Sequence, residues 1–162
     1  MKKYKWLIIL LNLILLLVYF NYSVVKKEKL LKDGQLVLLE LAPVDPRSLM
    51  QGDYMNLRYK ISRNFDDNDI PKRGYCVVRI DTNGIADKVR FQKDPTPLYE
   101  GEYLIKYKAS GRWNVNIGAE SFFFQEGEGE KYETARYGGI KIDKNGNSLL
   151  IGLYDEQRKK IE

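Results

Sequence analysis

The residue types in this chain limit the chemistry that it can carry out. Its 162 residues include no His and a single Cys, Cys76. Catalysis by a Ser-His-Asp or Cys-His set is therefore excluded, as are imidazole metal ligands. One Cys forms neither an internal disulfide nor a CxxC redox pair. We expect no cofactor and no metal, and we expect Cys76 to be an inert thiol in the core.

One serine and two lysines leave a route to nucleophilic catalysis. Ser48 precedes Lys60 and Lys72, and a Ser/Lys hydrolase needs its serine beside a desolvated, neutral lysine. Membrane-anchored signal peptidases carry Ser-Met-x-Pro followed later by Gly-Asp. Here Ser48 is followed by Leu-Met-Gln-Gly, so the proline is missing and the spacing is shorter. A hydrolase resembling signal peptidase is therefore the alternative hypothesis, and a protein that is not an enzyme is expected.

Acidic residues in the C-terminal third are a second group that could do chemistry, as a carboxylate pair or an oxygen-ligand cation site. They are Glu126, Glu128, Glu130, Glu133, Asp143 and Asp155. The run EGEGE lacks the Asp-x-Asp-x-Asp-Gly order of a calcium loop. A solvated acidic turn is the simpler interpretation.

The segment DPRSLMQGDYMNLRY, residues 45–59, has the strongest pattern in the chain. Pro46 fixes φ, and Gly52 permits a positive φ just before a strand, which predicts a corner between two strands. Asp53 could accept backbone N–H groups in a purely structural corner. A surface loop that carries a binding site is the other interpretation, and both remain open.

Gly52-Asp53-Tyr54, Leu57 and Tyr59 resemble the GDYXXLXY motif that names a bacterial protein family, and the C-terminal run extends the likeness to about residues 36–154. The resemblance implies membrane-anchored, exported domains of unknown biochemical function, some of them beside or fused to multi-pass membrane proteins. It assigns no catalytic residue. The candidate motif and binding residues are Asp45, Arg47, Gly52, Asp53, Tyr54, Leu57, Tyr59, Glu126, Arg136 and Tyr137. Arg136 is expected to be a buried charge paired with Asp53 or Asp45.

A basic leader, residues 1–5, and an uncharged apolar segment, residues 6–25, precede this domain. Twenty helical residues span about 30 Å, the thickness of the hydrocarbon core of a bilayer. We predict a single transmembrane helix in the cell membrane, with the N-terminus cytoplasmic and the domain extracytoplasmic. Lys26, Lys27 and Lys29 act against this orientation. A cleaved signal peptide is the main alternative, although no A-x-A-like site follows the apolar core.

The charge balance of the chain reflects its membrane topology and does not indicate a nucleic-acid partner. The chain has 27 Lys+Arg against 22 Asp+Glu, but part of the excess lies in the leader and the two signs are interspersed elsewhere. No basic stripe indicates nucleic acid. Asn12 lies within the apolar segment, where an amide can hydrogen-bond to another helix. We therefore expect an accessory or binding module that acts with a multi-pass membrane protein.

The elements that position these residues follow mostly a period of two after a charged spacer at 26–35. Strands are predicted at 36–41, 54–61, 75–80, 85–91, 102–109, 113–118, 121–124, 139–143 and 148–155, with hairpin turns at 81–84 and 144–147. Residues 127–138 have the only helical potential after the apolar segment. The pattern predicts one mainly β domain at 36–155, an antiparallel sandwich or partly open barrel, and a charged tail at 156–162.

Overall fold

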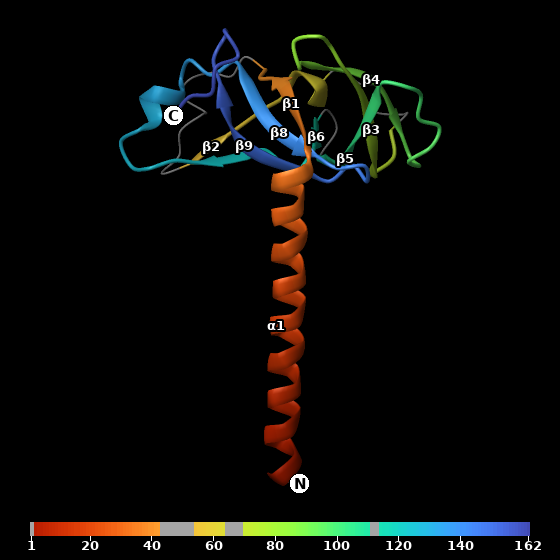
Figure 1. The fold of residues 1–162 in the computed structure, drawn as a ribbon, viewed down its shortest axis with the longest axis vertical. Helices are drawn as coiled ribbons and strands as arrows, with labels where there is room; N and C mark the ends of the chain where they lie inside the picture. Colours follow the sequence, from red (N-terminus) through yellow and green to blue (C-terminus); the bar gives the residue numbers. More distant parts are fainter. Residues whose placement is uncertain (1, 43–53, 64–69, 111–113) are drawn as a thin grey trace.

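The computed structural model describes residues 2–42, 54–63, 70–110 and 114–162, and it has one long helix with a β domain at its C-terminal end (Figure 1). The helix is α1, Lys2–Asp33. The strands are β1 Gln35–Glu40, β2 Tyr54–Asn56, β3 Arg73–Ile80, β4 Ala86–Gln92, β5 Glu102–Ser110, β6 Asn114–Asn116, β7 Ser121–Phe123, β8 Tyr137–Ile142 and β9 Ser148–Tyr154. Two 3-10 turns, η1 Lys60–Ser62 and η2 Gly129–Tyr132, lie between strands.

Helix α1 includes the predicted apolar segment and continues beyond it. It runs through residues 26–33, within the segment predicted as a spacer, and ends one residue before β1. Its side chains are almost all exposed until Leu30, which is buried against the domain. The helix therefore joins the β domain directly, with only Gly34 between the two elements.

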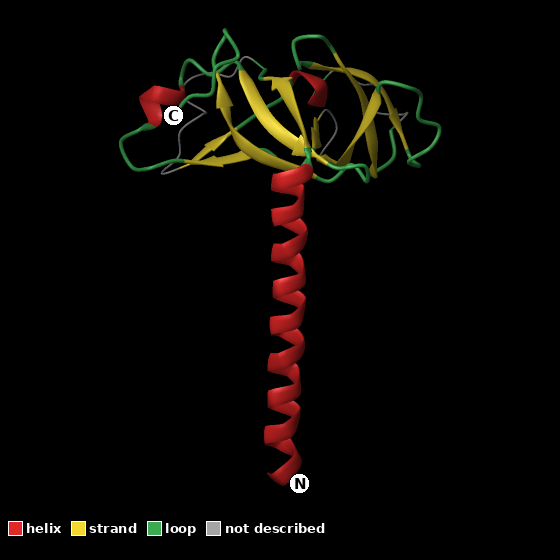
Figure 2. Cartoon of the chain, viewed as in Figure 1, coloured by secondary structure: helices red, strands yellow, loops and turns green. Residues whose placement is uncertain are grey.

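The strands form two antiparallel sheets and a short ribbon (Figure 2). One sheet has the order β1-β8-β9, the second has the order β4-β3-β5-β6, and β2 pairs with β7. All paired strands are antiparallel. The prediction of a mainly β, antiparallel domain after one apolar helix is confirmed.

The two predicted hairpin turns are present, and each is held by an aspartate. The Asp81 carboxylate accepts N–H bonds from Asn83 at 2.8 Å and Ile85 at 2.9 Å. These backbone hydrogen bonds, above all the one from Ile85, lower the pKa of Asp81. The Asp143 carboxylate accepts corresponding bonds from Asn145 and Asn147, both at 2.9 Å. The same type of hydrogen bond, from backbone N–H groups to an aspartate side chain, thus stabilises the β3–β4 turn and the β8–β9 turn.

The predicted strand 54–61 forms a hydrogen-bonded ladder only over β2, Tyr54–Asn56. Its predicted alternation of buried and exposed side chains is correct. Met55, Leu57 and Tyr59 are buried, while the residues between them are exposed. The ladder with β7 ends at Asn56 because the chain then bonds to different partners. The Leu57 N–H donates to the Glu120 carbonyl, and η1 follows Tyr59.

One hydrophobic core lies between the sheets. Its members come from β1, from the segment after β2, and from β3, β5 and β8, and they include Val37, Leu57, Val78, Ile105 and Ile140. Cys76 belongs to this core and is fully buried. Burial raises the pKa of its thiol to about 12, which agrees with the expectation of an unreactive cysteine.

Candidate functional site

The motif segment provides the candidate site, because its second half lies at the centre of the fold. Tyr54, Leu57 and Tyr59 are within the described residues, whereas Asp45, Arg47, Gly52 and Asp53 lie outside them. The structural and the binding interpretation of that first half both stay predictions.

Tyr59 is the most deeply buried side chain of the motif. Its hydroxyl donates a hydrogen bond of 2.5 Å to the Ala119 carbonyl. Burial first, and the nearby Glu120 charge second, raise the pKa of this phenol well above its usual value. Its ring lies so close to Gly138 that a Cβ there would be 2.8 Å from the ring. The last residue of GDYXXLXY thus packs on the glycine of Arg136-Tyr137-Gly138.

Backbone hydrogen bonds connect the same two segments through the end of β1. The Leu41 N–H donates to the Arg136 carbonyl at 2.9 Å, and the Ala42 N–H donates to the Arg58 carbonyl at 2.7 Å. The Arg136 N–H in turn donates to the Tyr154 carbonyl at 2.8 Å. Segments that are about 80 residues apart are therefore held as one unit, and Leu57 and Tyr59 have a structural role in it.

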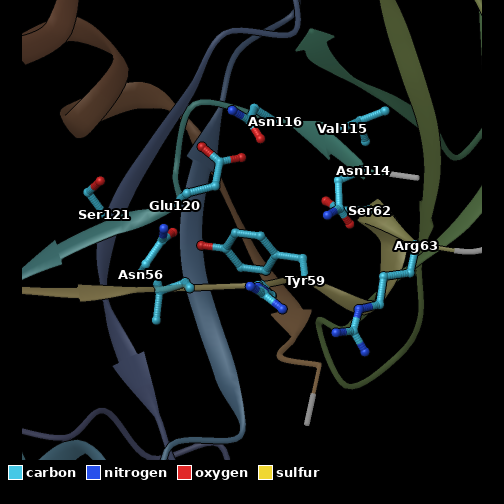
Figure 3. A pocket seen from close by; sticks show the side chains of 11 residues that line it. Asn56, Tyr59, Ser62, Arg63, Asn114, Val115, Asn116, Glu120 and Ser121 are labelled. Carbon is cyan, nitrogen blue, oxygen red and sulfur yellow. The ribbon is translucent and has the colours of Figure 1, made fainter. Parts of the chain in front are cut away.

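A polar pocket of about 390 Å³ lies beside this unit. It is lined by Asn56, Leu57, Arg58, Tyr59, Ser62, Arg63, Asn114, Val115, Asn116, Glu120 and Ser121. Figure 3 shows Glu120, Ser62 and Asn114 around the Tyr59 ring. The Ser62 hydroxyl is buried and has no hydrogen-bond partner among the described residues. An unpaired buried hydroxyl is costly, which makes this pocket a candidate for binding a polar group.

The charged residues of the pocket differ in their hydrogen bonding and in their exposure. The Glu120 carboxylate accepts N–H bonds from Ile117 and from Gly118, the latter at 3.0 Å, so it stabilises its own loop. Arg58 is exposed and Arg63 is half-buried. The pocket offers amide, hydroxyl and guanidinium donors to a polar ligand. Within the described residues, no hydrogen bond links Ser62 to a base.

The remaining sequence candidates do not gather at this pocket. Tyr54 is half-exposed and contacts the exposed Phe123 ring, with centroids 5.8 Å apart. Glu126 is exposed, and Tyr137 is half-buried in β8. Arg136 contributes its backbone, and its side chain is exposed. The expectation of a buried Arg136 charge is wrong, because the residue joins the edge of the core through its main chain.

The lysine nearest to the motif is not suited to act as a base. Lys60 is exposed and donates to the Glu40 carboxylate at 2.8 Å. This hydrogen bond raises the pKa of Lys60, whereas a Ser/Lys hydrolase needs a lowered value. The predicted nucleophile Ser48 lies outside the described residues. No cluster of three or more acidic or Cys side chains that could hold a metal occurs within the described ranges.

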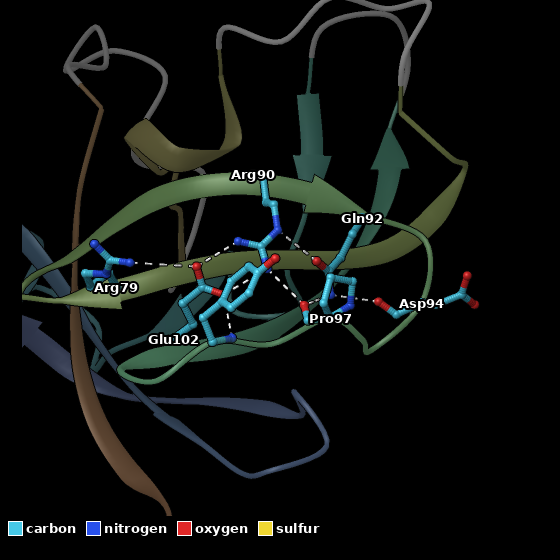
Figure 4. Close-up of polar contacts among 7 residues, drawn as sticks. Arg79, Arg90, Gln92, Asp94, Pro97 and Glu102 are labelled. Carbon is cyan, nitrogen blue, oxygen red and sulfur yellow. Dashed lines mark hydrogen bonds and ion pairs between the residues drawn. The ribbon is translucent and has the colours of Figure 1, made fainter.

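The four-stranded sheet contains a partly buried ion pair that no pattern in the sequence indicates (Figure 4). Arg90 binds both carboxylate oxygens of the buried Glu102, at 2.7 and 2.8 Å. It also donates to the Pro97 carbonyl at 2.9 Å. The Arg90 hydrogen bond is the main reason why the pKa of Glu102 falls to about 2. Only the hairpin geometry that pairs β3 with β4 and β5 brings these residues together, so no local pattern indicates the pair.

Comparison with known proteins gives one match. A family model described as GDYXXLXY protein matches residues 16–153. No curated protein and no solved structure matches the chain. Since the family model covers most of the chain, the match extends far beyond the short motif at residues 52–59.

Proposed function

We propose that this chain, which belongs to the GDYXXLXY protein family, is a membrane-anchored accessory module. In this proposal α1 crosses the membrane once, with the N-terminus cytoplasmic. The β domain lies outside the cytoplasm and acts with a multi-pass membrane protein. No catalytic step is part of the proposal.

The exposed apolar surface of α1 is the observation that carries the proposal. The helix is long and apolar enough to cross a membrane, and none of its apolar window is buried by the domain (Figure 1). A helix that is apolar on all sides is stable only if something other than water covers it. A lipid bilayer covers such a helix at the length found here, about 30 Å for residues 6–25.

The N-terminal leader supports the orientation. Residues 2–5 carry three lysines and no acid immediately before the apolar segment. Short basic segments tend to stay in the cytoplasm, whereas long domains are translocated largely regardless of their charge. The charge of the leader therefore outweighs that of Lys26, Lys27 and Lys29, which belong to the long C-terminal part.

Of the two asparagines in the apolar helix, Asn12 supports a helical partner in the membrane. The Asn21 side-chain amide donates to the Leu17 carbonyl of its own helix at 2.9 Å. Asn12 is exposed and makes no hydrogen bond through its side chain within the described residues. In hydrocarbon, an amide is stabilised by about 0.5–2 kcal/mol when it bonds to a neighbouring helix. A second transmembrane helix would satisfy Asn12.

Co-purification of the full-length chain tests this proposal. The protein carries a C-terminal tag, is solubilised in mild detergent, and is compared as parent, Asn12→Leu and Asn21→Leu. We expect a stoichiometric membrane protein with the parent and with Asn21→Leu, and a loss of at least fivefold with Asn12→Leu. A monodisperse monomer without partner contradicts the proposal. Labelling of Ser48 by a fluorophosphonate probe would also contradict the proposal and would support the alternative, a Ser/Lys hydrolase.

A further inference from the structure

A second, larger cavity lies where α1 meets the β domain. Its volume is about 870 Å³, near the upper end of the range of small-molecule sites. Three lysines, Lys26, Lys29 and Lys144, line it together with the apolar Leu98, Leu104 and Ile142. All of its lining residues belong to the described part of the chain.

The position of this cavity along α1 sets its depth relative to a bilayer. The apolar segment ends at Val25, so the wall formed by Lys26 to Asp33 begins at the hydrocarbon boundary. Seven residues of helix rise by about 10 Å. The headgroup layer of a bilayer is about 5–8 Å thick on each side. If residues 6–25 span the membrane, this cavity opens into the headgroup layer.

The charges around the cavity favour an anionic ligand. None of Lys26, Lys29 and Lys144 forms an ion pair with an acidic side chain within the described residues. The acidic residues of the lining are Asp33, Glu102 and Asp143. Of these, Glu102 is neutralised by Arg90, and Asp143 accepts hydrogen bonds from its own turn. The Asp143 carboxylate keeps its charge, so the three lysines are opposed by two aspartates, Asp33 and Asp143, and the lining has an excess of one positive charge.

The apolar wall of the cavity is held in place by the Arg90–Glu102 pair. Arg90 donates to the Pro97 carbonyl at 2.9 Å, and the Tyr99 N–H donates to Glu102 at 3.1 Å (Figure 4). These bonds fix the chain on both sides of Leu98, whose side chain is 43% exposed. This arrangement fits a phospholipid. The fixed, exposed leucine can contact the upper acyl chain, and the lysines beside it can bind the phosphate.

We propose that the cavity between α1 and the β domain binds one anionic phospholipid of the surrounding membrane. Its phosphate lies among the three lysines, and the start of its acyl chains contacts Leu98, Leu104 and Ile142. The inference rests on the proposed membrane anchor. It goes beyond that proposal by naming a lipid class and the residues that bind it.

Native mass spectrometry of the full-length protein in detergent micelles tests this inference. Palmitoyl-oleoyl phosphatidylglycerol and the corresponding phosphatidylcholine are added separately. The triple variant Lys26→Gln/Lys29→Gln/Lys144→Gln removes the binding charges. The control Lys72→Gln/Lys108→Gln/Lys159→Gln removes the same charge from exposed positions outside the cavity. Leu98→Asp provides a second variant, at an exposed position of the lining.

We expect one retained phosphatidylglycerol on the parent and on the control triple. Retention should fall at least tenfold in the cavity triple and in Leu98→Asp, and phosphatidylcholine should be retained at least fivefold less than phosphatidylglycerol. Absence of a retained lipid, equal retention of both lipids, or no effect of the cavity triple would overturn the inference. Alkaline extraction of membranes separates the two proposals. A protein that resists extraction but retains no lipid refutes the lipid site alone, and an extracted protein refutes the anchor and the site together.

Discussion

At the scale of single residues, Tyr59 shows how the family motif stabilises the domain. Its ring packs on Gly138, and its hydroxyl satisfies the Ala119 carbonyl. A buried carbonyl that loses its donor costs about 1–3 kcal/mol. We therefore expect Tyr59→Phe to lower the free energy of unfolding by about 1–3 kcal/mol, measured by urea denaturation in detergent. Unchanged stability would show that the hydroxyl is not needed.

The contact between Tyr59 and Gly138 predicts coupled mutations. A Cβ at Gly138 would lie 2.8 Å from the Tyr59 ring, and overpacking of this kind costs about 1–3 kcal/mol. Gly138→Ala should therefore destabilise the parent, but should cost clearly less in a Tyr59→Leu background, where the ring is absent. A double-mutant cycle measures this coupling. Additive effects would contradict the proposed contact.

The lowered pKa of Glu102 predicts how the stability of the protein changes in acid. Its pKa is about 2 in the folded protein, against an ordinary value of 4.5. A lowered folded pKa stabilises the protein above the unfolded pKa, and this stabilisation is lost as pH falls from about 4.5 to 2. Glu102→Gln should lower the melting temperature at pH 7 and flatten its decline over that acid range. The neighbouring exposed Glu100→Gln is the control, and equal behaviour of both variants would contradict the role of Glu102.

At the scale of elements, the join between α1 and β1 depends on Gly34. The Gly34 N–H donates to the Leu30 carbonyl at 2.9 Å, and a Cβ at Gly34 would clash with that same oxygen. Leu30 is itself buried against the domain. The last turn of the helix is thus part of the folded β domain.

Replacement of Gly34 should therefore loosen the join without unfolding the sheets. In Gly34→Ala, the helix has to lose its last hydrogen bond or shift away from β1. We expect faster tryptic cleavage after Lys32 than in the parent, while circular dichroism keeps the β signal. Leu31→Ala, at an exposed position of the same turn, is the control. Unchanged cleavage of Gly34→Ala would contradict a tight join.

The elements also show what sequence can and cannot predict here. Asp-Thr-Asn-Gly at 81–84 and Lys-Asn-Gly-Asn at 144–147 are local turn signals, so both hairpins were predictable from the sequence. The alternation of residues 54–61 correctly predicted which side chains are buried. The contacts of Tyr59 with Gly138 and of Arg90 with Glu102 were not predictable, because they depend on which strands pair. The polar pocket and the cavity at α1 depend on those same pairings.

At the scale of the whole molecule, the chain is an apolar stalk that carries a β domain (Figure 1). The stalk was predictable because the sequence has an uncharged segment of membrane-spanning length. The antiparallel fold was predictable from the period-two alternation of apolar residues. The two proposals of function concern different levels of this helix. Asn12 lies within its apolar part, and the proposed lipid site lies at its C-terminal end, where it meets the domain.

Cysteine labelling of oriented membrane vesicles tests the central claim most directly. Cys76 is buried with a pKa of about 12, so the natural chain should give almost no background with a membrane-impermeant maleimide. Tyr4→Cys reports on the leader and keeps its lysines, and Lys159→Cys reports on the exposed end of the domain. We predict that right-side-out vesicles label Lys159→Cys alone and that inside-out vesicles label Tyr4→Cys alone. The reverse pattern, or labelling of both positions from one side, would contradict a single-pass anchor with an extracytoplasmic domain.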